Sequence, residues 1–93
     1  MQNFRLFQTA IMFFKKCKCV SMPRHLREQL DRASASIGCN IGEGYGRSSK
    51  LDKRRFYRIA LGSTRECRTL LILAEHEDPE LMGMLDFLGG GLY

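Results

Sequence analysis

Lysine and arginine side chains recur between residues 47 and 68 at spacings that place several of them on one face of a helix. The candidates for nucleic-acid contact are Arg47, Lys50, Lys53, Arg54, Arg58 and Arg65. Positions three and four apart are neighbours on a helix surface, and the planar guanidinium group binds phosphate oxygens through paired hydrogen bonds. The pattern therefore predicts a surface that binds the phosphates of RNA or DNA.

The same face has a second interpretation, as a contact between subunits. The candidates for that contact are Tyr57, Leu61, Arg68 and Ile72. Aromatic residues and arginine are enriched at protein interfaces, and apolar side chains in such a basic face need cover. Both interpretations hold together if an oligomer presents a basic rim to RNA, so both stay open at this point.

A smaller group of polar residues lies near the end of the helix expected at residues 24–43. Asn40, Glu43 and Arg47 are placed to form a network that fixes the bend between the second and third helices. Arg32 shares the polar side of the same helix. A catalytic role requires an acid–base pair in a defined pocket, and the sequence does not indicate one. We therefore predict no catalytic residues and a protein that is not an enzyme.

The cysteines and histidines are not spaced as metal ligands. The four cysteines are Cys17, Cys19, Cys39 and Cys67. Zinc sites usually use paired C-x-x-C spacing, which is absent. Cys67 falls among core positions, where a thiol acts as a small apolar group. Gly42, Gly44 and Gly46 follow a helix and not a strand, which argues against a dinucleotide loop. We predict no metal and no cofactor.

Hydrophobic periodicity predicts four helices that position these groups. The first three are expected at residues 3–19, 24–43 and 49–75, with Ser48 or Ser49 capping the third and Gly44–Gly46 ending the second in a left-handed conformation. The fourth is short, begins after Pro79 and ends at the glycine triplet 89–91. Short connections favour antiparallel neighbours. The predicted fold is all-α, an antiparallel up-down-up-down four-helix bundle that forms one domain over residues 1–93.

Apolar stripes predict the core of this bundle. The first helix carries two of them, one through Phe4, Phe7, Ile11 and Phe14, the other through Leu6, Ala10 and Phe13. The second helix buries a stripe through Leu26, Leu30, Ala33, Ile37 and Ile41. The stripe expected on the third helix comprises Phe56, Ile59, Ala60, Ser63, Cys67, Leu70, Leu71 and Ala74.

Charge and length restrict the partners. The chain has 93 residues and a net charge of +5, and its acidic residues gather late in the sequence. This asymmetry favours an anionic partner, although a charged surface that maintains solubility explains it equally well. No apolar run approaches the roughly 20 residues of a membrane-spanning helix, and no secretory signal is evident. We predict a cytoplasmic protein without membrane contact that gains burial by forming homo-oligomers.

Several motifs in a fixed order resemble a known family. They are the run 29–37, then 40–44 and Arg47-Ser48, followed by Arg55-Phe56 and 59–63. This pattern resembles the four-helix-bundle family that includes the 23S rRNA intervening-sequence proteins. The motif residues that the resemblance picks out are Arg32, Asn40, Glu43, Gly44, Arg47, Gly62, Ser63 and Glu66.

The resemblance also implies properties of the whole molecule. It implies a bacterial protein that assembles as a pentameric ring, related to accessory proteins of diversity-generating retroelements. We therefore expect a non-enzymatic homo-oligomer that binds rRNA or another structured RNA or DNA. The alternative is an adaptor or scaffold ring that docks a partner protein such as a reverse transcriptase.

Overall fold

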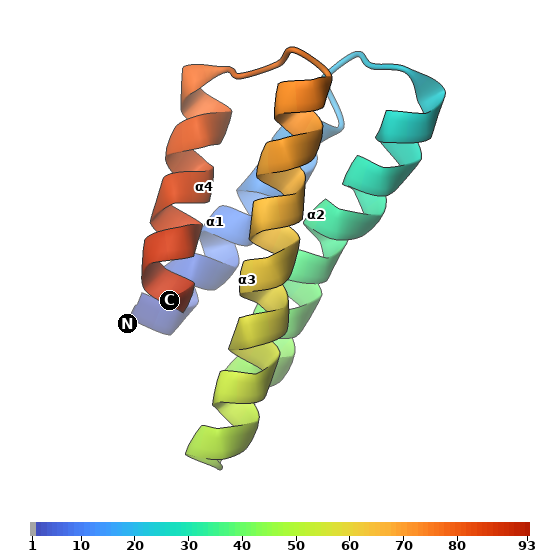
Figure 1. Ribbon diagram of the computed structural model, residues 1–93. Helices are drawn as coiled ribbons and strands as arrows, with labels where there is room; N and C mark the ends of the chain where they lie inside the picture. Colours follow the sequence, from blue (N-terminus) through green and yellow to red (C-terminus); the bar gives the residue numbers. More distant parts are fainter. Residues whose placement is uncertain (1) are drawn as a thin grey trace.

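Four α-helices make up the computed structural model, which describes residues 2–93 (Figure 1). They are α1 (Gln2–Cys17), α2 (Arg24–Tyr45), α3 (Lys50–Leu73) and α4 (Pro79–Leu92). No strand occurs within these residues, which confirms the all-α class. Helix α1 packs against α2 and α4, and α3 packs against the same two helices, so that the four helices surround one core.

Helices α2 and α3 are longer than α1 and α4. Helices α2 and α3 have 22 and 24 residues, whereas α1 and α4 have 16 and 14. Figure 1 shows that α1 begins and α4 ends on the side of the bundle where α2 connects to α3, and that α2 and α3 project well beyond them. The first turns of α3 are therefore covered by α2 but not fully by α4.

Side chains at the helix starts explain where α3 and α4 begin. Ser49 accepts a hydrogen bond from the Asp52 amide at 3.3 Å, which confirms the predicted cap. Asp78 accepts one from the Leu81 amide at 3.3 Å, and Pro79 occupies the first turn. Each cap satisfies an amide that has no partner inside its helix.

Helix α2 ends differently from the prediction. It runs to Tyr45, and Gly46 has a φ of −83°, in the right-handed region. The predicted left-handed glycine is therefore wrong at this position. The Gly46 amide donates to the Gly42 carbonyl at 3.3 Å, which closes the last turn without a change of hand. Within residues 2–93 the left-handed residue is Glu75, just beyond α3, with a φ of 60°.

The prediction that glycines 89–91 end the fourth helix is also wrong. Helix α4 continues through them to Leu92. Its leucines at 81, 85, 88 and 92 repeat at helical spacing, and all four are buried. Burial of this stripe outweighs the low helix propensity of glycine, because packing contributes most of the stability of helices in proteins.

The buried stripes agree with the prediction most closely on α2. Its five predicted positions are all buried. On α1 the stripe through Leu6, Ala10 and Phe13 forms the core and extends to Cys17, whereas Phe4 and Ile11 are exposed. On α3, Ile59 is 48% exposed, so its assignment to the core is wrong. Thr64 is buried instead and donates to the Ala60 carbonyl at 2.8 Å, which satisfies its hydroxyl.

The cysteines carry free thiols. Cys67 is buried as predicted, and Cys17 is buried on α1. Burial is the main cause that raises the pKa of Cys17 to about 12, and it also raises the pKa of Cys67. Both groups are therefore neutral at pH 7 and pack as small apolar side chains. Within the described residues, no three His, Cys, Asp or Glu side chains gather as metal ligands. No helix in residues 2–93 has both the length and the hydropathy needed to cross a bilayer.

Candidate nucleic-acid interface

A groove follows the boundary between α3 and the last turns of α4. It consists of two adjoining pockets of about 540 and 400 Å³ that share Leu61 and Tyr93. We call it the α3–α4 groove. The first pocket is lined by Lys50, Lys53, Arg54, Tyr57, Arg58, Leu61, Gly91, Leu92 and Tyr93. The second is lined by Leu61, Thr64, Arg65, Arg68, Leu85, Asp86, Gly89, Gly90 and Tyr93.

Cations on α3 dominate the charge of this groove. Five of them have no carboxylate within 4.0 Å among the described residues: Lys50, Lys53, Arg54, Arg58 and Arg65. The acidic side chain that lines the groove, Asp86, is paired with Arg68 at 2.6 Å. The charges of the five cations are therefore not neutralised within the chain, and they create a positive field along the groove.

The structure separates Arg47 from the other five residues predicted to contact nucleic acid. Arg47 lies at the α2–α3 corner, where its guanidinium group donates to Glu43 at 3.0 Å. Its guanidinium carbon also lies 4.9 Å from the centre of the Phe56 ring. These contacts neutralise its charge locally and hold its side chain against α3. Arg47 therefore supports the corner, and it does not line the groove.

The predicted interface residues are likewise not all brought together. Tyr57, Leu61 and Arg68 line the α3–α4 groove, but Ile72 lies outside it with 45% of its surface exposed. The Tyr57 hydroxyl is buried and has no hydrogen-bond partner among the described residues. Burial raises the pKa of Tyr57, and the nearby Tyr45 adds to the effect. The hydroxyl is therefore neutral at pH 7.

Of the predicted network of Asn40, Glu43 and Arg47, the contact between Glu43 and Arg47 is present, but Asn40 does not join it. Asn40 donates instead to the backbone carbonyl and side-chain oxygen of Ser36, at 2.8 and 3.0 Å. Ser63 on α3 donates to the same Ser36 oxygen at 2.9 Å, which links the two helices. The i,i+4 spacing of Ser36 and Asn40 is the signal in the sequence that could have predicted their hydrogen bond. Its link to Ser63, which lies 27 residues from Ser36, depends on the packing of α2 against α3.

The remaining motif residues fall into two groups. Gly44 is buried against α3. Arg32, Gly62 and Glu66 are exposed, and neither Arg32 nor Glu66 forms an ion pair within the described chain. The exposed members therefore make no contact in one chain that explains their residue types.

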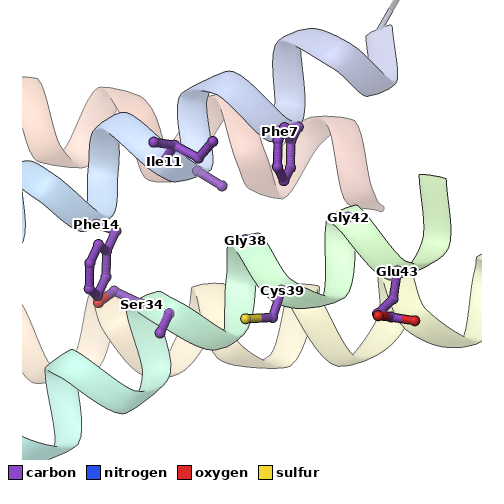
Figure 2. Close-up of a pocket in the computed structure, with 10 residues that line it drawn as sticks. Phe7, Ile11, Phe14, Ser34, Gly38, Cys39, Gly42 and Glu43 are labelled. Atoms are coloured by element: carbon purple, nitrogen blue, oxygen red, sulfur yellow. The ribbon is translucent and has the colours of Figure 1, made fainter. Parts of the chain in front are cut away.

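A second groove lies on the other side of the molecule, between α1 and α2. Its volume is about 430 Å³. Figure 2 shows Phe7 and Phe14 reaching from α1 toward α2, opposite Gly42 and Ser34. This α1–α2 groove contains three of the four residues of the first stripe predicted on α1, namely Phe7, Ile11 and Phe14. It is largely apolar, and Glu43 is its charged residue.

A family model described as 23S rRNA-intervening sequence protein matches residues 2–78. The matched range contains α1, α2 and α3 and ends just before α4. Searches of curated proteins and of solved structures found no match. The cation-bearing side of the α3–α4 groove lies inside the matched range, and the α4 side lies outside it.

Proposed function

The chain belongs to the 23S rRNA-intervening sequence protein family, and we propose that it is a non-enzymatic helical bundle that binds nucleic acid through the α3–α4 groove. One observation carries this proposal: five cations line a single groove, and no carboxylate of the described residues lies within 4.0 Å of them. Nucleic-acid backbones offer a row of negative charges, and binding releases the counterions condensed on them. The groove thus has the charge and the extended shape that a phosphate backbone requires.

The chemistry of the lining residues supports binding and not catalysis. Arginine and lysine remain protonated at pH 7, so the five cations serve as hydrogen-bond donors. The groove's acidic side chain, Asp86, is already engaged by Arg68 at 2.6 Å. Among the described lining residues, the groove therefore offers donors for phosphate oxygens and no free side-chain carboxylate or imidazole to serve as a general base.

The proposal includes the assembly of the chain. The helices run up-down-up-down as antiparallel neighbours, which is supported by the short connections and by the packing of each helix against two others. Copies of the chain associate through exposed apolar side chains of α3, which include Leu51, Ile59, Ile72 and Leu73. Covering such side chains is the usual driving force of association. Light scattering measures the resulting mass directly, and a monomer at all concentrations would contradict this part.

Reversing two charges in the groove tests the binding proposal. Arg54→Glu together with Arg58→Glu should lower the affinity for a structured RNA fragment at least about tenfold at low salt, because phosphate contacts dominate such binding. The change replaces attraction by repulsion at two exposed sites and leaves the core intact. A gel shift across several salt concentrations measures the effect.

The matched control carries the same change of charge elsewhere. Lys15→Glu with Arg32→Glu alters exposed residues of α1 and α2 that form no ion pair in the described chain. This pair should retain most of the wild-type affinity. Equal losses in the two double variants would mean that net charge, and not the groove, is responsible.

The α1–α2 groove favours a second candidate function, an adaptor that docks a protein partner. Ile11 lines this apolar groove and is exposed, and Phe4 and Met12 are further exposed apolar side chains of α1. In that case a partner should remain bound after nuclease treatment and be released by Ile11→Arg, which places a charge on the apolar surface. The Arg54 and Arg58 reversal should leave it bound. Co-purification of the partner with each variant tests this. If the Ile11→Arg variant retains the partner, the α1–α2 groove is not the docking site.

A further inference from the structure

Resting on that proposed function, we infer that the α3–α4 groove takes one single strand of nucleic acid, and not a double helix. The phosphates of the strand lie along the α3 cations, and its bases lie over the apolar floor. Three features of the groove carry this inference: a single line of charges, a narrow width and an apolar floor.

The charges form a single line along α3. Lys50, Arg54, Arg58 and Arg65 are separated by four, four and seven residues, which keeps them on one stripe of the helix. At a rise of 1.5 Å per residue, the stripe from Lys50 to Arg65 is about 22 Å long. One line of cations matches one backbone. A double helix presents two backbones, and the described residues on the α4 side of the groove provide no second line of free cations to meet the other one.

The groove runs between two helices that pack against each other, α3 and α4. The axes of packed helices lie about 8–10 Å apart, so a duplex is too wide to enter and would contact only the rim. The middle of the α4 wall is formed by Gly89, Gly90 and Gly91, which carry no side chains, and the rest by Leu85, Asp86, Leu92 and Tyr93. A Cβ atom added at Gly89 or Gly90 would meet nothing within 4 Å, so the groove is open along this wall.

The floor suits base faces. Leu61 is shared by the two pockets, and Tyr57 and Leu92 line the first pocket with it, beside the exposed Tyr93. Unpaired bases stack on aromatic and apolar side chains, whereas the faces of paired bases are hidden inside a duplex. The apolar floor between cations therefore gains contacts from a single strand that a double helix does not offer.

Full-length protein titrated with labelled oligonucleotides tests the inference. The probes are one single-stranded RNA, the single-stranded DNA of the same sequence, and the duplex of each. Fluorescence anisotropy should give an affinity at least about tenfold higher for the single strands, because stacking adds to the phosphate contacts. With four phosphate contacts, one for each cation of the stripe, the logarithm of the single-strand affinity should fall with the logarithm of salt with a slope of about −2.8.

A variant that fills the groove without changing charge separates the two kinds of binding. Gly90→Leu places a side chain in the open groove and favours the helix, because leucine is a better helix former than glycine. It should lower single-strand affinity about tenfold by blocking base contacts and leave duplex affinity unchanged. Gly83→Leu is the matched control, since Gly83 is exposed on α4, has equal room for a Cβ and lines neither pocket. Circular dichroism confirms that both variants are folded.

The outcomes distinguish this inference from the function on which it rests. The inference is supported if single strands bind more tightly than duplexes and if Gly90→Leu, but not Gly83→Leu, weakens this binding. That holds whether RNA and DNA bind equally or RNA binds better through its 2′-hydroxyls. The inference is overturned if duplexes bind as tightly as single strands or more tightly, and if Gly90→Leu leaves this binding unchanged. If the charge reversal at Arg54 and Arg58 abolishes that duplex binding, the proposed function still stands. Absence of binding to every probe at low salt overturns both.

Discussion

Replacing Phe13 with alanine should lower the free energy of unfolding by about 3–5 kcal/mol. Phe13 is the largest of the fully buried side chains, with 0% of its surface exposed. Its removal leaves a cavity that the surrounding helices fill only partly. A domain of this size has a total stability of roughly 5–15 kcal/mol, so the variant should lose a large share of it. Urea denaturation followed by circular dichroism at fixed protein concentration measures the loss.

The neighbouring phenylalanine provides the control. Phe14 is only partly buried and lies at the edge of the α1–α2 groove. Phe14→Ala removes the same atoms but should cost less than half as much, because its ring already contacts solvent in the folded state. Similar losses from the two variants would show that α1 is rotated relative to the core described above.

This pair of variants concerns a choice that the sequence left open. Both apolar stripes of α1 have helical spacing, and a stripe of either kind satisfies the rule for a core-facing helix. The residues of α1 alone do not determine which stripe faces inward. The choice depends on the packing of α1 against both α2 and α4, and that packing buries Leu6, Ala10 and Phe13. On α2 one stripe was clearly apolar, and there the prediction was confirmed at all five positions.

The candidate site shows the same division between local and long-range information. Lys50, Arg54 and Arg58 were identified from their spacing, because helical neighbours are a property of one segment. The opposite wall of the groove was missed, since the glycine triplet was interpreted as the end of the helix. Its place beside α3 follows from the buried leucines on both sides of it, Leu88 and Leu92. Arg47 belongs to the same basic run, but its contacts with Glu43 and Phe56 place it elsewhere.

Replacing Gly44 with alanine should lower the free energy of unfolding by about 1–3 kcal/mol. Gly44 is buried where α2 crosses the start of α3. A Cβ atom there would lie 2.7 Å from Cε1 of Tyr57 and 3.2 Å from Cβ of Phe56. The Tyr57 ring would have to move away, and the Cβ atom of Phe56 cannot move without its backbone. The steric cost outweighs the gain of up to about 1 kcal/mol that alanine brings to a helix.

Gly62→Ala should have the opposite effect and raise the free energy of unfolding by about 0.5–1 kcal/mol. Gly62 lies in the middle of α3, is exposed, and a Cβ atom at this position would meet nothing within 4 Å. Both glycines belong to the motif on which the resemblance to the family rests, but only Gly44 has a steric reason within one chain. Thermal or urea denaturation of the two variants tests the contrast directly. If Gly62→Ala destabilises the protein instead, a second molecule must approach the backbone at this position, and the exposed face of α3 is then an interface.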